Sequence, residues 1–139
     1  SRLNPIGSSD GYTWKVRDYV YETLLTTDKD TGDWIPYLGT EWEISKDKTE
    51  FIFDLRQKVF WQDGVEFTAE DVKFSFDILF KDTFNTITTR AFFEGIKEVQ
   101  ILDKYKVKFI AKDQSYKNFD VIAGTLKIFP KALILIIVK

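Results

Sequence analysis

Apolar and polar residues alternate along two neighbouring segments, 40–45 and 50–55. In the second segment Phe51, Phe53 and Leu55 fall on one face of an extended chain, and the residues between them fall on the other. A short charged connection separates the two segments. This pattern predicts two paired strands with one buried face.

Two further pairs of apolar runs each enclose a tight turn. They are 59–61 with 65–67 around Asp63-Gly64, and 96–102 with 105–111 around Asp103-Lys104. Asp-Gly between apolar runs favours a hairpin, because glycine readily adopts the positive φ that tight turns require. We therefore predict two more hairpins.

Apolar residues at helical spacing predict helices at 10–25, from Thr68 to about residue 80, and at 114–122. The Thr68 hydroxyl can cap the second helix, and Glu70 and Asp71 lie at the positive end of its dipole. A buried stripe is expected along this helix at Val72, Phe76, Leu79 and Phe80. The Thr-rich residues 81–93 are expected to form a polar excursion.

Three or four helices and about six short strands place the chain in the α+β class, with a mixed or antiparallel sheet and flanking helices. At 139 residues it can bury one core, so we expect a single partial domain. Its parts are an entry loop and helix at 1–25, a smaller subdomain at 26–132 and an apolar tail at 133–139. The tail is either an exposed end or a buried strand, and it is far shorter than the ~20 residues of a membrane-spanning helix.

The composition excludes several classes of function. With no cysteine and no histidine, the chain lacks the usual thiol nucleophile, the usual proton shuttle near neutral pH and the common zinc ligands. A net charge of −2, from 20 basic and 22 acidic residues, gives no electrostatic attraction for nucleic acid or anionic lipid. We expect no enzymatic activity, no cofactor and no nucleic-acid partner.

Two acidic groups could suggest chemistry. The turn 28–33 offers oxygen ligands at alternate positions, but a calcium loop of the EF type needs Gly at its sixth position and Glu at its twelfth, where this chain has Asp33 and Gly39. We favour a solvated turn without a metal. Glu41 and Glu43 share one strand face, and with a partner near Asp113 they could form the two-carboxylate site of a glycosidase. A solvated strand face is the favoured interpretation.

Aromatic residues are abundant, with 4 Trp, 6 Tyr and 13 Phe. Most occur at buried-face spacing and are assigned to the core, and Trp14, Trp34 and Trp61 are the expected exceptions. Exposed aromatic rings stack on sugars and peptides. A stand-alone carbohydrate- or peptide-binding module is therefore an alternative function.

The stretch from Leu38 to Asp77 resembles the signature region of the bacterial extracellular solute-binding proteins of family 5. The segments that carry the resemblance, in order and spacing, are Leu38–Ser45, Phe51–Arg56 and Val59–Val72. Flanking segments agree too, at Leu3-Asn4-Pro5, 21–25, 101–109 and Pro130-Lys131-Ala132. Gln62 and Phe60 depart from the family, where many members carry His and Lys. The family includes the oligopeptide-, dipeptide- and nickel-binding proteins of ABC importers.

The resemblance implies a non-catalytic subdomain of a type II periplasmic-binding-protein fold, because family members have two lobes and this chain resembles only their N-terminal portion. The intact protein would capture a peptide or similar small solute in the periplasm or at the cell surface. It would then deliver the solute to the permease subunits of an ABC importer. A subdomain whose whole role is to support the adjacent lobe is a further alternative.

The resemblance also implies a ligand-binding loop. The residues that match the stretch facing the ligand cleft in the family are Ser8, Ser9, Asp10, Gly11 and Tyr12. The signature stretch from Leu38 to Asp77 is expected to determine the fold and to contact no ligand itself.

Overall fold

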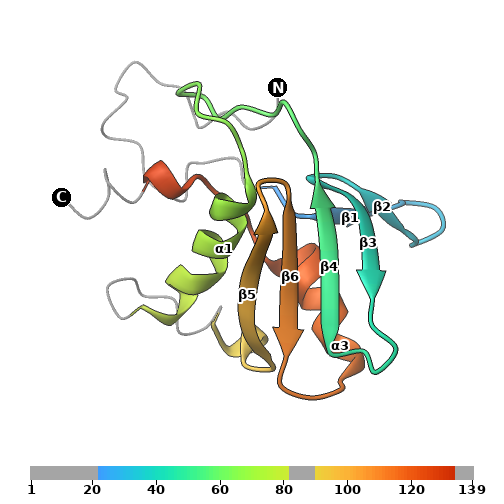
Figure 1. Ribbon diagram of the computed structural model, residues 1–139. Coiled ribbons are helices and arrows are strands. Elements are labelled where there is room, and N and C mark those ends of the chain that lie inside the picture. The colour runs from blue at the N-terminus through green and yellow to red at the C-terminus, as the bar shows by residue number, and fades with distance from the viewer. Residues whose placement is uncertain (1–21, 82–89, 134–139) are drawn as a thin grey trace.

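A four-stranded antiparallel sheet with strand order β3-β4-β6-β5 forms the centre of the protein (Figure 1). The computed structural model describes residues 22–81 and 90–133. The sheet strands are β3 (Gly39–Ile44), β4 (Glu50–Leu55), β5 (Ile96–Asp103) and β6 (Lys106–Ala111). A separate two-stranded ribbon consists of β1 (Leu25–Thr27) and β2 (Trp34–Pro36).

The helices are short. Among the described residues two segments are α-helical, α1 (Ala69–Asp77) and α3 (Tyr116–Asp120). The remaining helical turns are η2 (Ile78–Phe80), η3 (Ala91–Phe93), η4 (Val121–Thr125) and η5 (Lys131–Leu133). Within the described residues no helix is long and apolar enough to cross a bilayer.

One face of the sheet is buried and the other is solvated. Phe51 and Phe53 of β4 lie opposite Phe109 and Val107 of β6, and all four are buried. The opposite face carries cross-strand ion pairs, from Lys106 to Asp54 at 3.5 Å and from Lys108 to Glu50 at 3.4 Å. This alternation along each strand produces a two-layer structure, because helices cover only the apolar face.

Helices α1 and α3 share the apolar face of the sheet. The Phe76 ring of α1 lies 6.4 Å from Phe109. The Phe119 ring of α3 lies 6.0 Å from both Phe51 and Phe53, and 5.8 Å from Trp34. Phe119 therefore joins the sheet to the β1–β2 ribbon.

Most of the predicted elements are confirmed. The strands at 40–45 and 50–55 pair as β3 and β4, and the runs at 96–102 and 105–111 pair as β5 and β6. The runs around Asp63-Gly64 also fold back on each other, but as a hairpin with a single bridge between Phe60 and Glu66. The fold class is confirmed as α+β with an antiparallel sheet.

The predicted C-terminal end of the helix at 10–25 is wrong, because residues 22–25 are not helical. Residues 10–21 lie outside the described part, but Leu25 opens β1 and Glu22 forms a β-bridge with Ile128. The backbone explains the difference, because the Leu24 carbonyl accepts hydrogen bonds from Tyr37 and Gly39. Pairing with distant segments therefore takes the place of helical hydrogen bonds.

Three aromatic assignments need correction. Trp61, expected to be exposed, is only 2% exposed. Phe80 was placed in the buried stripe of α1, but it is exposed, because the chain tightens into η2 after Asp77. Phe93, at the end of the expected polar excursion, is fully buried at the end of η3. Trp34 is half-buried against Phe119.

Replacing Phe119 with alanine should destabilise the protein by about 2–4 kcal/mol, because the ring fills the junction between sheet and ribbon. Tyr116→Ala in the same helix is the matched control, since Tyr116 is 84% exposed. It should change stability by less than ~0.5 kcal/mol. Urea unfolding followed by Trp fluorescence measures both. Equal losses in the two variants would contradict the packing role of Phe119.

Candidate functional site

The predicted ligand-binding residues Ser8, Ser9, Asp10, Gly11 and Tyr12 lie outside the described residues, so their role remains a prediction. Within the described part, polar groups converge along the buried side of α1, from its N-cap to Ser75. The group comprises Trp61, Thr68, Asp71, Ser75 and the backbone of Lys131, and is called the Asp71 cluster below.

The carboxylate of Asp71 joins three separate segments of the chain. Its Oδ2 accepts hydrogen bonds from the Trp61 indole N–H at 3.2 Å and the Thr68 backbone N–H at 3.0 Å. Its Oδ1 accepts one from the Lys131 backbone N–H at 2.7 Å. The Thr68 hydroxyl in turn accepts from Glu70, which completes a capping box at the start of α1. Both carboxylate oxygens are therefore occupied by the protein itself.

Burial changes the acidity of this carboxyl. Asp71 is only 4% exposed. Burial raises the pKa of Asp71 above its ordinary value, and the three accepted hydrogen bonds from Lys131, Thr68 and Trp61 oppose the rise. The nearby charge of Glu70 adds to it. The main chemical property of this group is its capacity to accept hydrogen bonds in a dry environment.

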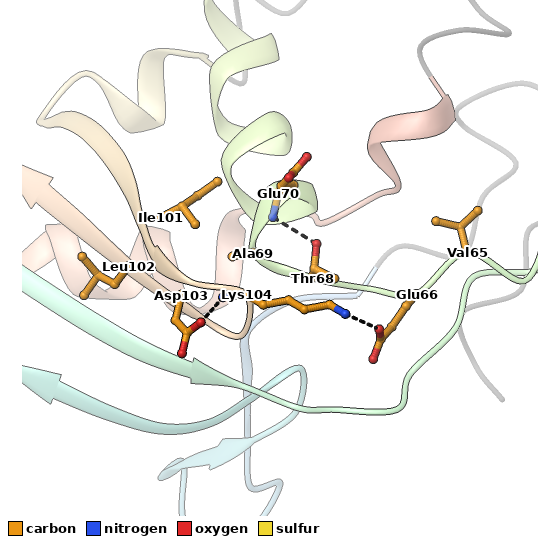
Figure 2. A pocket seen from close by; sticks show the side chains of 9 residues that line it. All are labelled: Val65, Glu66, Thr68, Ala69, Glu70, Ile101, Leu102, Asp103 and Lys104. Atoms are coloured by element: carbon orange, nitrogen blue, oxygen red, sulfur yellow. Dashed lines mark hydrogen bonds and ion pairs between the residues drawn. The ribbon is translucent and has the colours of Figure 1, made fainter.

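Beside the Asp71 cluster lies a surface groove of about 590 Å³ (Figure 2). One wall is the segment that leads into α1, and the other is the turn between β5 and β6. The lining residues are Val65, Glu66, Thr68, Ala69, Glu70, Ile101, Leu102, Asp103 and Lys104. Val65, Ile101 and Leu102 are exposed apolar residues, so the lining of the groove combines apolar side chains with charged ones.

Glu66 connects the two walls of the groove. Its Oε2 accepts a hydrogen bond from the Tyr105 hydroxyl at 2.6 Å, and its Oε1 lies 3.3 Å from the Lys104 ammonium. The Tyr105 hydrogen bond is the largest effect that lowers the pKa of Glu66. The Ala69 N–H donates to the Lys104 carbonyl at 2.8 Å, so the walls are also joined through the backbone.

The acidic residues considered for catalysis do not converge. Glu41 and Glu43 are exposed on the solvated face, opposite Asp54 and Ile52. Asp113 follows the end of β6, where Ala111 is bonded to Thr49. The partners of Glu43 and Glu41 on β4 lie three and five residues from Thr49, which corresponds to roughly 10–16 Å along the strand. In addition, β3 and β6 are not neighbours in the sheet. This separation is too large for the paired carboxylates of a glycosidase.

The acidic turn at 28–33 uses its carboxylate internally. Asp28 Oδ1 accepts hydrogen bonds from the backbone N–H groups of Asp30 at 2.8 Å and Thr31 at 2.9 Å, and these bonds lower the pKa of Asp28. Gly32 supplies a positive φ of 79°. The predicted turn is therefore confirmed. The described residues contain no cluster of three or more His, Cys, Asp or Glu side chains that could hold a metal ion.

Sequence reasoning identified Asp71 as a helix-cap acid and missed its central position. Its side chain does complete the capping box, as predicted. Two signals in the sequence point to the further role. Asp71 and Ser75 are four residues apart, and they lie next to Val72 and Phe76 on the apolar stripe. Polar residues on the buried face of a helix need partners, so this pair indicates a buried polar cluster.

Comparisons with known proteins agree with this fold. The sequence profile described as "Bacterial extracellular solute-binding proteins, family 5 Middle" matches residues 33–137. The chain belongs to this family. It spans about a quarter of the length of the curated relatives that it matches.

Individual members of family 5 support the assignment. The dipeptide-binding protein of Escherichia coli K12 is 31% identical over 125 residues, which cover 78% of this chain and 23% of that protein. NikZ from Campylobacter jejuni, solved in complex with Ni(L-His), has a TM-score of 0.73 and 33% identity over 97% of this chain and 26% of its own. DppA from Helicobacter pylori, solved with the peptide STSA, has a TM-score of 0.69 and 28% identity over 83% of this chain and 26% of its own.

The resemblance to family 5 was carried by the stretch from Leu38 to Asp77, and the structure gives physical roles to several of its residues. Trp61 and Thr68 donate to Asp71, Gly64 adopts the positive φ of the hairpin, and Phe51 and Phe53 fill the core. These are contacts within the protein. The signature segment therefore builds the fold.

Asp71→Ala should lower the free energy of unfolding by about 3 kcal/mol, because one buried and two partly buried N–H donors lose their acceptor. Glu70→Ala is the matched control. It also removes one negative charge from the first turn of α1, but its ion pair with Lys131 is exposed, so the loss should stay below ~1 kcal/mol. Urea unfolding followed by circular dichroism measures the difference. A loss of the same size in both variants would show that Asp71 acts only through the helix dipole.

Tyr105→Phe should raise the pKa of Glu66 toward its ordinary value, because the hydroxyl that favours the carboxylate is removed. In the unsubstituted protein the pKa of Glu66 is lower folded than unfolded. Its contribution to stability is thus fully present at pH values above the ordinary pKa of a glutamate. It is lost as the pH falls through the lowered pKa of the folded state. NMR titration of the side-chain carboxyl carbons measures the shift. The pKa of Asp47, lowered by Ser45 and Thr49, should not change. An unchanged pKa of Glu66 would contradict the hydrogen bond.

Proposed function

We propose that this chain is part of the solute-binding component of an ABC importer, which captures peptides or similar small solutes in the periplasm or at the cell surface. The observation that carries the proposal is the match to family 5 over residues 33–137. The dipeptide-binding protein of Escherichia coli and the peptide-bound DppA of Helicobacter pylori favour a peptide. NikZ, bound to Ni(L-His), represents a second class of solute in the same fold.

In this proposal the solute is enclosed between two lobes and then passed to the permease subunits in the membrane. Closure of two lobes around a small ligand offsets the entropy lost on capture, because the ligand is contacted on both sides. The chain covers about a quarter of its relatives' length, and most of the enclosing surface would belong to the rest of the protein.

Within such a protein, residues 26–132 serve as a supporting subdomain, and the loop Ser8, Ser9, Asp10, Gly11 and Tyr12 faces the solute. The support for this division comes from the Asp71 cluster. Its polar groups join segments of the chain, and Asp71 is buried with both of its carboxylate oxygens bonded within the protein.

The alternative of a stand-alone module with an aromatic binding face receives less support. The exposed aromatic residues of the described part include Phe60, Phe80, Phe92 and Tyr116. They belong to the hairpin before α1, to η2, to η3 and to α3, and the hairpin and α3 lie at opposite ends of the sheet (Figure 1). The ring contacts among the described residues join no two of these four.

Calorimetric titration with a pool of di- to pentapeptides tests the proposal. A full-length protein that contains this chain should bind members of the pool with micromolar or tighter affinity. The 139-residue chain alone should show no saturable binding in that range, because a single side of the site cannot enclose the ligand. Micromolar binding by the short chain would contradict the two-lobe account. A full-length protein that binds no peptide of the pool would overturn the peptide assignment.

A further inference from the structure

We propose that Asp71 and Ser75 are positioning residues that fix the exit segment, residues 128–131, and so set the orientation of this subdomain relative to the rest of the solute-binding protein. The inference rests on the proposed function for its effect on solute capture. The contacts that fix the exit segment stand independently of it.

Helix α1 holds the exit segment through two buried polar side chains. Ser75 is fully buried, and its hydroxyl oxygen accepts a hydrogen bond from the Phe129 N–H at 3.0 Å. The same hydroxyl donates to the Asp71 carbonyl at 2.7 Å, with the Phe129 carbonyl at 3.1 Å as a second acceptor. Asp71 then accepts from the Lys131 N–H at 2.7 Å. The N–H groups of Phe129 and Lys131 are thus bound by Ser75 and Asp71, which lie one helical turn apart on α1.

The other side of the exit segment is bound to the start of the described chain. The Ile128 N–H donates to the Glu22 carbonyl at 2.8 Å in an antiparallel bridge. Ile128 is fully buried, and the Phe129 ring lies edge-on to Phe74 of α1 at 5.7 Å. In Figure 1 the red segment that leads to η5 runs beside α1. The two covalent connections of this subdomain, before Glu22 and after Lys131, therefore start from one place.

This arrangement has a mechanical consequence. A subdomain attached through two adjacent connections can rotate about them as a hinge unless a third contact restrains one of the connections. The bonds from Asp71 and Ser75 to the exit segment are such a restraint, because α1 packs on the sheet through Phe76. Loss of the restraint would leave the subdomain folded but variable in orientation. The lobe that it supports would then be less well organised for closure on a solute.

Ser75→Ala tests the inference, because it removes the hydroxyl and keeps the helix. Val107→Ala is the control, since it opens a cavity in the sheet-facing core at a fully buried residue that has no hydrogen bond to the exit segment through its side chain. The two variants are compared at urea concentrations that give equal global stability. The readouts are native-state hydrogen exchange of the Phe129 amide in the 139-residue chain, and affinity for the peptide STSA in the full-length protein.

We expect the Phe129 amide to exchange about tenfold faster in Ser75→Ala than in Val107→Ala, since only the first variant removes its acceptor. We also expect STSA affinity to fall about tenfold in Ser75→Ala and to stay within about twofold in Val107→Ala. Equal exchange rates would overturn the restraint, and equal affinities would overturn its effect on capture. If the unsubstituted full-length protein does not bind STSA, the peptide assignment is in question, and the exchange rates alone decide the inference.

Discussion

The rest of this structure depends on a buried carboxylate that accepts hydrogen bonds from three parts of the chain, one of them sixty residues away. Asp71 receives the Trp61 indole, the Thr68 backbone and the Lys131 backbone. Asp71 is only 4% exposed, and the hydrogen bonds from its three N–H donors are buried or partly buried. Each is costly to leave without a partner, so the hairpin before α1, the start of α1 and the exit segment must occupy one relative arrangement.

The hydrogen bonds of Asp71 act together with the apolar packing of the sheet. The four-stranded sheet buries one face through Phe51, Phe53, Val107 and Phe109, and the helices cover that face. Apolar packing sets which side of each element is buried, but it is non-directional. The polar cluster adds direction, because it fixes where α1 begins and holds residues 129–131 against α1. The same residues provide much of the pattern by which a member of solute-binding protein family 5 can be recognised.

Much of the fold could be predicted from local patterns. Period-two alternation located β3 and β4, the apolar runs around Asp103-Lys104 located β5 and β6, and the Thr68 cap located the start of α1. Two of the errors come from pairing between distant elements. Glu22 bonds with Ile128, so the helical spacing before Leu25 did not predict its strand. Trp61 is buried because its partner, Asp71, lies on another element.

The functional assignment could be predicted at the level of the family but not from the geometry of a site. The string from Leu38 to Asp77 identifies the family, and the described residues of this string contact one another. Individual pairing within the Asp71 cluster could not be predicted, because no local rule connects Asp71 to Lys131, sixty residues away. The polar pair Asp71 and Ser75 on the apolar stripe of α1 was the available signal.

Native-state hydrogen exchange of the Thr68 and Lys131 amides tests the central role of Asp71 most directly. Both amides donate to its carboxylate, and neither lies within a strand of the sheet. The account predicts that both exchange only through global unfolding, with opening free energies close to the stability of the whole protein. Exchange of either amide as fast as that of an exposed amide without a hydrogen-bond acceptor would contradict it.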